Sequence, residues 1–377
     1  MSDSPRLYHS ILEKMKTFHS SERITRLRNL ALLVMGLYQG ESVHLAKIVK
    51  HWPTEVRLLS RVQRLRRFLD NQRTEDTTFF RPVARQILSR FCGSDHPVRL
   101  LLDTTKVGPS CQIATVSVAY RKRALPLCWK AVEKTKGHLD TAQIKDLLRE
   151  AAAHVEAVQE ASSAEMPPIW VLGDSEFGQV DVIQWVSRRD WHYVFRVYGH
   201  YTACSIEKGA PTDGTFRQIG DWPLSEGQTR PIGPVLLTED RQYRGAHLIL
   251  HREEGYDDPW YLVSDRPVGR RTLRHYEKRM WIEELHGDLK GHGVELKASR
   301  LEDPTRLERL MLGVAIAYAW LIALGSRVVK RGLRPMFDRK SRRDKSYFRL
   351  GMDWLEHRLT LKRPILVRFS PSSENVR

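Results

Sequence analysis

The chain of 377 residues is 41% hydrophobic and contains ten tryptophans, which predicts a globular protein of two or three domains with a substantial packed core. Its 62 Lys and Arg against 45 Asp and Glu leave a formal net charge of +17, which favours an anionic partner, and nucleic acid fits better than a membrane surface. The longest apolar run, Leu310 to Gly325, is shorter than the ~20 residues that a spanning helix needs, so we expect a buried core helix and no membrane partner.

The N-terminus and the cysteines indicate a reducing compartment. MSDSPRLYHSILEK contains no apolar signal region, so we expect the chain to stay in the cytosol, where the chromosome is. The four cysteines are scattered without a CxxC pair, which suits neither a zinc ribbon nor a disulfide framework. We therefore expect ordinary reduced thiols at Cys92, Cys111, Cys128 and Cys204.

Residues 1–92 are predicted to form a small all-α DNA-binding domain. From Ile24 to about Arg90 the pattern is helical and strongly basic, with few strand signals. Ser42 can cap a helix that runs through Lys50, Trp52-Pro53 breaks it, and Thr54 can cap a second helix that runs to about Asp70. This is the outline of a helix-turn-helix.

The second of these helices carries two stripes. The apolar, inward stripe consists of Leu58, Val62, Leu65 and Leu69. The basic stripe consists of Arg57, Arg61, Arg64 and Arg67. The basic stripe fits the major groove of DNA, with Arg57, Arg61 and Arg64 as candidates for recognising a DNA end, and it fits equally well the solvated face of an ordinary bundle helix.

After Gly93 the pattern changes to short β-rich runs. VRLLLD ending at Asp103, Gln112 to Tyr120 and Arg123 to Val132 look like a three-stranded meander. A helix from Thr141 to about Gln159, the buried strand PIWVLGD, a helix from about Val180 to Arg188 and the strand WHYVFRVY complete a βββαβαβ order. This order resembles that of an RNase H-like fold, and such a layout would place Asp103 on the first, central strand and Asp174 at the end of the neighbouring fourth strand, so that the two carboxylates can share a metal site.

The rest of the chain divides by composition. Residues 201–267 turn to Gly, Pro and short alternating runs, which predicts a β-rich insertion. Residues 268–325 return to helical patterns, and residues 326–377 form a basic C-terminal region whose last six or so residues we expect to be disordered.

The segment YEKRMWIEELHGDLK, from Tyr276 to Lys290, is the most informative of the sequence. Read as one helix, it places Tyr276, Arg279, Glu283 and Lys290 near one another on a single face, which suits a phosphate backbone held beside a metal. The alternative, an i,i+4 ion pair between Arg279 and Glu283, explains neither Tyr276 nor Lys290. Glu284 points about 100° away around the helix, so the spacing favours Glu283 as the ligand.

These four positions match the Y-x2-R-x3-E-x6-K signature, and the chain resembles the bacterial insertion-sequence transposases of the IS-four family, members of the DDE group with an RNase H-like core. DTTK at Asp103 to Lys106 and GDSEFG at Gly173 to Gly178 look like the first two catalytic aspartates of that family. The resemblance implies an RNase H-like α/β core in two parts, residues 93–200 and 268–325, interrupted by the β-rich insertion.

The resemblance also implies the chemistry of the site. Asp103, Asp174 and Glu283 would hold two Mg²⁺ ions, with Mn²⁺ as a substitute, because hard carboxylates suit these ions and no His and Cys pattern points to zinc. Arg279 and Lys290 would contact phosphates beside the scissile bond, and Tyr276 would do so through its hydroxyl.

Two further positions carry expectations from the resemblance. Trp260 stands where the family has a tryptophan that stacks on a base flipped out of the transposon end, although a strand tryptophan is more often a core residue. Arg196 stands where the family has an arginine that contacts DNA.

The expected function is cut-and-paste transposition of double-stranded DNA by a synapsed homodimer at the bacterial nucleoid. It comprises binding of terminal inverted repeats, nicking, hairpin formation and opening, and strand transfer. Two alternatives remain at this stage: a DNA-binding regulator without catalysis, and a stand-alone nuclease of the same fold.

Overall fold

A computed structural model describes residues 3–108, 110–133, 139–207, 210–212, 214–339 and 343–372. The N-terminal part is helical, as predicted, and a further helix precedes Ile24. The helices are α1 (Ser4–Phe18), α2 (Ile24–Gly40), α3 (Leu45–Lys50), α4 (Leu58–Asp70) and α5 (Asp76–Leu88).

The two predicted helix caps are wrong. Helix α3 begins after His44 and α4 begins after Arg57, and neither helix has a side-chain cap. The hydroxyl of Ser42 accepts a hydrogen bond from the His44 N–H at 3.3 Å, and that of Thr54 accepts one from the Val56 N–H at 3.3 Å. Each side chain therefore closes its own local turn instead of capping a helix.

The later start of α4 also changes its predicted apolar stripe. Val62, Leu65 and Leu69 are buried, as expected, but Leu58 in the first turn is 42% exposed. The predicted apolar stripe is therefore buried from Val62 onward and not at Leu58.

The central strands and helices follow the predicted βββαβαβ order, and the RNase H-like α/β fold is confirmed. The elements are β1 (Val98–Val107), β2 (Cys111–Tyr120), β3 (Arg123–Glu133), α6 (Thr141–Ala161), β4 (Ile169–Gly173), α7 (Val180–Ser187) and β5 (His192–Arg196). Strands β3, β2 and β1 are antiparallel neighbours, and β1, β4 and β5 run parallel. All four cysteines are free thiols.

Strand β1 continues past Asp103 to Val107 and pairs with β2 along this length. The sequence predicted that this strand ends at Asp103. In the structure Asp103 instead lies inside the strand. A residue inside a paired strand has a fixed backbone, so its carboxylate is held by the sheet.

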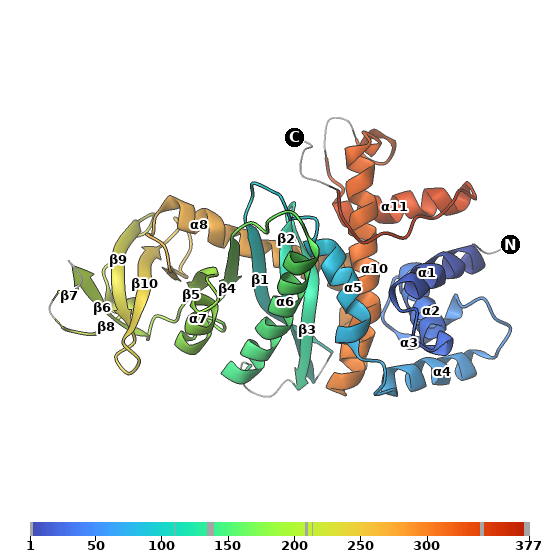
Figure 1. Cartoon of the computed structure of the whole chain (residues 1–377), viewed down its shortest axis with the longest axis horizontal. Helices are drawn as coiled ribbons and strands as arrows, with labels where there is room; N and C mark the ends of the chain where they lie inside the picture. The colour runs from blue at the N-terminus through green and yellow to red at the C-terminus, as the bar shows by residue number, and fades with distance from the viewer. Residues whose placement is uncertain are drawn as a thin grey trace.

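The insertion is β-rich, as predicted, and it extends the same sheet. Its strands are β6 (Thr202–Glu207), β7 (Ala210–Pro211), β8 (Arg217–Gln218), β9 (Thr229–Leu237), β10 (Tyr243–His251) and β11 (Trp260–Ser264). The antiparallel pairing of β11 with β5 joins the two halves in the order β3-β2-β1-β4-β5-β11-β10-β9-β6-β7, with β8 beside β6. Figure 1 shows this succession of strands from the middle of the molecule to its left side.

The segment from Tyr276 to Lys290 is not one continuous helix, which corrects the prediction. Helix α8 (Arg270–Glu277) leads into a 3₁₀ turn (Lys278–Met280), then α9 (Trp281–Gly287) and a π turn (Asp288–His292). The π turn follows from Asp288, a buried side chain that Arg123 of β3 contacts through Nε at 3.0 Å and to which the Tyr318 hydroxyl donates at 3.2 Å. Tertiary contacts at Asp288 thus set the local path of the backbone.

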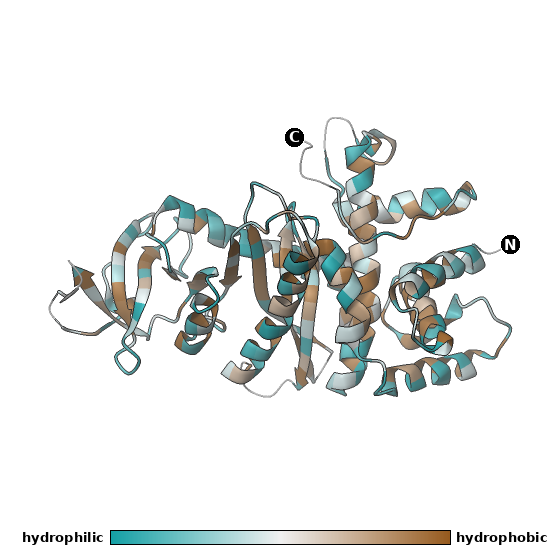
Figure 2. Ribbon diagram, in the orientation of Figure 1, coloured by the Kyte–Doolittle hydropathy of each residue, from teal (hydrophilic) through white to brown (hydrophobic). Residues whose placement is uncertain are grey.

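The predicted core helix at Leu310 to Gly325 is confirmed as part of α10 (Pro304–Lys330). Length and composition would allow this helix to span a membrane, but 89% of its most apolar window is buried inside the protein. It lies between β3 and the N-terminal helices, and Figure 2 shows hydrophobic residues along it and along the central strands. Helix α11 (Tyr347–Thr360) crosses it closely, since a Cβ on Gly325 would lie 1.8 Å from the Tyr347 carbonyl.

The C-terminal segment runs back along α10. The Ser372 N–H donates to the Ser326 hydroxyl at 2.9 Å, and the Tyr120 hydroxyl donates to the Ser372 carbonyl at 2.8 Å. The expected disorder of the last six or so residues is therefore wrong at Ser372, and the rest of that prediction, residues 373–377, lies outside the described residues.

Candidate active site

Two aspartates follow the last paired position of the parallel strands β1 and β4. Leu102 is paired with Gly173, so Asp103, within β1, and Asp174, the residue directly after β4, are neighbours across the two strands. Asp103 is 6% exposed. Asp174 lies just beyond β4, where its Oδ1 accepts a hydrogen bond from the Glu176 N–H at 3.0 Å.

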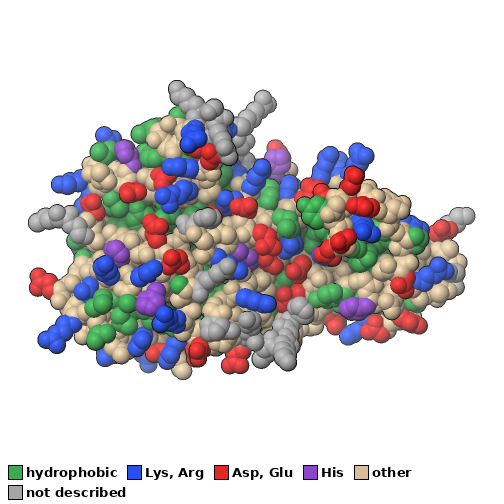
Figure 3. Space-filling model, turned by 180° about the vertical axis from the view of Figure 1, so that it is seen from behind, with side chains coloured by type: hydrophobic (Ala, Val, Ile, Leu, Met, Phe, Trp, Pro, Cys, Tyr) green, Lys and Arg blue, Asp and Glu red, His purple; other side chains and the backbone are tan. Residues whose placement is uncertain are grey.

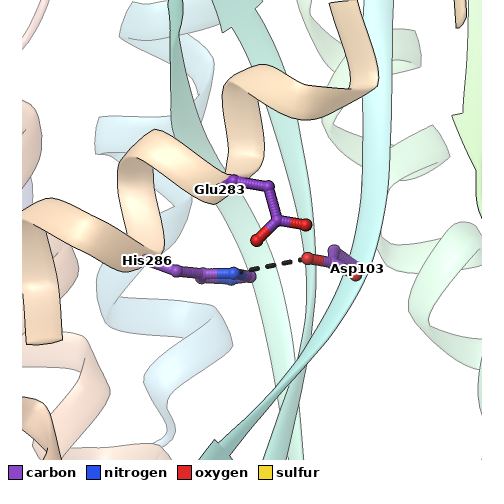
Figure 4. Close-up of side chains that lie close together, drawn as sticks. All are labelled: Asp103, Glu283 and His286. Atoms are coloured by element: carbon purple, nitrogen blue, oxygen red, sulfur yellow. Dashed lines mark ion pairs between the residues drawn. The ribbon is translucent and has the colours of Figure 1, made fainter. Parts of the chain in front are cut away.

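Helix α9 brings two more side chains to Asp103. Figure 4 shows Glu283 and His286 pointing from the helix toward the aspartate on the strand. One potential ligand atom from each of Asp103, Glu283 and His286 lies within 4.8 Å of the others, and Nδ1 of His286 is 3.3 Å from Oδ2 of Asp103. The first and last predicted acids are therefore brought together from opposite ends of the core, while Asp174 is outside this group of three.

His286 is a site residue that the sequence reasoning missed. The sequence has no paired His and Cys spacing of a zinc site, so the histidine was not predicted as a ligand. The signal was local, because His286 follows Glu283 by three residues and so lies on the same face of the helix, one turn on.

Arg279 lies among the carboxylates. Its Nη1 is 3.6 Å from Oδ1 of Asp103 and its Nη2 is 3.6 Å from Oε1 of Glu283. Burial lowers the pKa of Arg279, but Tyr276 and the carboxylates of Asp103, Asp174 and Glu283 outweigh it, so the pKa is raised and the cation is favoured. Its buried Nε and Nη1 have no hydrogen-bond partner among the described residues, so the guanidinium has donors left for an incoming anion.

The electrostatics of Asp174 show that the acids repel one another. Burial raises the pKa of Asp174, and the nearby charge of Asp103 raises it further, while Arg279 and the Glu176 N–H act in the opposite direction. Holding like charges together in this way favours the binding of a cation. Figure 3, the view from behind, shows acidic side chains gathered in the middle of the face.

Tyr276 packs into the core next to Trp260. It is 2% exposed, its ring centroid lies 4.9 Å from that of Trp260 in an edge-to-face arrangement, and burial raises its pKa to about 12. Trp260, the first residue of β11, is partly buried between Tyr276 and His251. The aromatic pair links the insertion to α8, the helix that precedes the one carrying Glu283.

Arg196 and Lys290 are the remaining predicted DNA contacts in the core. Arg196, at the end of β5, forms an ion pair with Asp258 and donates to the Pro259 carbonyl at 2.9 Å, which holds the loop before β11. Lys290 is half-buried within the π turn. Glu284, the rival of Glu283, is paired with Nη1 of Arg123 at 2.8 Å, which directs it toward β3.

Two of the N-terminal arginines are engaged inside their own domain. Arg61 donates to the Val56 carbonyl at 2.8 Å and to the Val49 carbonyl at 3.0 Å, and Nε of Arg64 donates to Asn29 at 2.8 Å. These contacts support the bundle-face alternative for Arg61 and Arg64. Arg57 is exposed where α4 begins.

The donor set fits a divalent metal ion. Carboxylate oxygens suit Mg²⁺ and Mn²⁺, and an imidazole nitrogen beside them suits Mn²⁺ better than Mg²⁺. The repulsion between Asp103 and Asp174 gives such an ion an electrostatic reason to bind. Asp103, Glu283 and His286 are the residues that could hold it.

An RNase H-like sheet with an acid cluster on its central strands defines a class of proteins that cut and join nucleic acids. Residues 113–320 match the model of a family described as the transposase DDE domain, which covers more than half of the chain. The chain belongs to this family, and as a transposase it has DNA as its substrate. The matched span contains Asp174 and Glu283 and begins after Asp103. A comparison with curated proteins found no match.

Proposed function

We propose that this transposase works by cut-and-paste and belongs to the IS-four group of insertion-sequence transposases. Each end of its element would be nicked to free a 3′-hydroxyl, which attacks the opposite strand to form a hairpin. Water then opens the hairpin, and the 3′ ends join target DNA. The observation that carries this proposal is the approach of Glu283 to Asp103 within 4.8 Å, from a helix far along the chain.

Asp103, Asp174 and Glu283 are the proposed catalytic residues, and they would hold two Mg²⁺ ions, with Mn²⁺ as a substitute. Bound there, the ions would activate the attacking oxygen and stabilise the leaving oxygen. Asp103 lies within a paired strand and Asp174 directly follows one, so Glu283 is the ligand whose position depends on the packing of α9. His286 contacts Asp103 and keeps that carboxylate oriented toward Glu283.

Arg279 is the proposed anchor for the phosphate beside the scissile bond. Its buried Nε and Nη1 make no hydrogen bond within the described residues, which supports this role, because a phosphate oxygen would accept from them. Lys290 and Arg196 would contact neighbouring phosphates as charges. Tyr276 would contact a phosphate through its hydroxyl, as predicted. The burial of its ring also supports a second role, in positioning Arg279, whose guanidinium lies 5.8 Å from the ring centroid.

Trp260 is the proposed platform for a flipped base during hairpin formation. The ring is only partly buried, and stacking of a base on an aromatic ring is worth ~1–3 kcal/mol. Its contact with Tyr276 would place the base close to the acid cluster.

The larger organisation is also proposed. Residues 1–92 would bind the terminal inverted repeats, with Arg57, Arg61 and Arg64 as candidate contacts, and residues 93–200 with 268–325 would form the catalytic core around the insertion of residues 201–267. The basic region of residues 326–377 would complete the chain. The protein would act as a homodimer on double-stranded DNA in the cytoplasm, at the nucleoid.

Incubation of the purified protein with labelled element ends and Mg²⁺ tests the proposal. We expect excised ends that carry hairpins. Binding of the ends without cleavage would contradict it in favour of a regulator, and cleavage without preference for the ends would contradict it in favour of a nuclease.

A further inference from the structure

A second group of charges lies at the C-terminal end of α10. A cavity of about 340 Å³ opens there, lined by five cationic side chains and the segment Ser370–Ser372. We name it the basic cavity, and its cationic residues are Arg90, Arg327, Lys330, Arg331 and Arg368. No acidic side chain is among the residues found to line it.

The basic cavity is built from three separate parts of the chain. Arg90 follows α5, Arg327 and Lys330 are in the last turn of α10, and Arg368 belongs to the C-terminal segment. That segment is fixed on both sides of the cavity, by the Trp320 indole N–H, which donates to the Leu366 carbonyl at 2.8 Å, and by the bonds of Ser372 to Ser326 and Tyr120. The cations are therefore held together by the fold.

The charges of the basic cavity repel one another. Burial lowers the pKa of Arg327, and the neighbouring charges of Arg331 and Arg368 lower it further. Nε of Arg90 is buried without a hydrogen-bond partner. No ion pair with a described carboxylate is found for Arg90, Arg327, Arg331 or Arg368.

The helix dipole explains only part of this arrangement. Cations in the last turn of a helix are stabilised by its negative end, which accounts for Arg327 and Lys330. It does not account for Arg90 and Arg368, which other segments bring to the same cavity. An anion with several acceptor oxygens would offset the repulsion and satisfy the open donors.

We propose that the basic cavity binds phosphates of the DNA backbone and is a second DNA contact, separate from the acid cluster. The proposal rests on the proposed function, which makes DNA the polyanion that this protein meets. Arginine forks match phosphate oxygens, and no Asn or Gln side chain that could read a base edge is among the lining residues. The contact is therefore independent of sequence.

The basic cavity is well separated from the carboxylates. Tyr120, which is bonded to its rim, is five positions along β2 from Thr115, the residue paired with Asp103. At about 3.3 Å per residue this corresponds to roughly 17 Å along the strand. One side chain cannot serve both places, so substitutions in the basic cavity leave the acid cluster unchanged.

The experiment measures binding of the full-length protein to a labelled duplex of random sequence, by fluorescence anisotropy in EDTA, over a series of NaCl concentrations. The test variant is Arg331→Gln with Arg368→Gln, two exposed side chains whose loss leaves the core intact. The control is Arg149→Gln with Arg189→Gln, which makes the same change in net charge on α6 and beyond α7, where the two arginines pair with Asp146 and Glu156.

We expect the test variant to lower the slope of log K against log salt by roughly 1 to 2, since each phosphate contact contributes about 0.9. The control variant should keep the wild-type slope. An equal slope in the test variant and the wild type would overturn the proposal. Thermal unfolding of both variants checks that they are folded.

Titration with inorganic phosphate separates the two sources of the anion. Weak or undetectable binding of free phosphate together with a reduced DNA slope supports a backbone site. Tight binding of free phosphate with an unchanged DNA slope overturns it in favour of a small-anion site. Because these measurements need no cleavage, a protein that fails to cut element ends would refute the proposed function and leave this test intact.

Discussion

Helix α9 and helix α4 each carry charged side chains along one face, but these side chains have different partners in the folded protein. In α9 the side chain of Glu283 and that of His286 point at an aspartate on a distant strand. In α4 the side chains of Arg61 and Arg64 turn back to their own domain. Spacing along a helix therefore identifies which residues share a face, but the partner across that face decides what they do.

Removing the acid from α9 is the strongest way to break this comparison. Glu283→Gln keeps the shape of the side chain and removes its charge, so we expect metal-dependent cleavage of element ends to fall by about 100-fold or more. Glu284→Gln is the matched control and should stay within a few-fold of wild type, because Glu284 pairs with Arg123. Equal losses in both variants would contradict the assignment of Glu283.

Substitution of His286 sharpens the account of the same face. His286→Gln removes the imidazole beside Asp103, and we expect the affinity for Mn²⁺ to fall by about 10-fold, with a smaller effect on Mg²⁺. Mn²⁺ binding followed by electron paramagnetic resonance measures this directly. His275→Gln, on α8, serves as a control that leaves Asp103 untouched, and an unchanged Mn²⁺ affinity in His286→Gln would rule out a role for the imidazole.

The arginines of α4 test the other side of the comparison. Arg61→Gln loses bonds to two backbone carbonyls, so we expect a destabilisation of about 1 kcal/mol in urea unfolding. Arg57→Gln should leave stability within about 0.5 kcal/mol of wild type, because Arg57 is exposed. Weaker binding of Arg57→Gln to element ends would support contact of Arg57 with the major groove of DNA. A loss of stability in Arg57→Gln would contradict the exposed position of this side chain.

The smallest expected effect concerns Asp174 and its pH dependence. Burial and the charge of Asp103 raise the pKa of Asp174, so ionising this carboxyl lowers the stability of the folded protein. The destabilisation is absent at a pH below the unfolded-state pKa, and it is complete at a pH above the raised pKa of the folded state. Asp174→Asn should therefore raise the melting temperature of the metal-free protein at pH 7, and the gain should shrink toward zero as the pH falls below about 4. A gain that stays constant with pH would show that the charge is not its cause.

Local patterns predicted the core well because each element of it is periodic and short. The short β-rich runs of β1 to β3 predicted the strand order, and the resemblance to a transposase family pointed to Asp103 and Asp174. The pairing of β11 with β5 was not predicted, because it joins residues 66 to 70 positions apart that meet only in the folded state.

Details of the site were missed for a related reason. At the π turn, Asp288 contacts Arg123 and Tyr318, which lie on other elements. The side chains of Ser42 and Thr54 form hydrogen bonds within local turns instead of capping the predicted helices. The positions of acids on a helix can be read from spacing, whereas interruptions of that helix arise from contacts that only the fold supplies.

Counting bound Mn²⁺ in the presence of element-end DNA tests the central claim, that Asp103, Asp174 and Glu283 together hold metal ions against DNA. The wild type should bind two ions per protomer by electron paramagnetic resonance, and Asp103→Asn, Asp174→Asn and Glu283→Gln should each lose at least one of them. Undiminished binding of both ions in all three variants would contradict it.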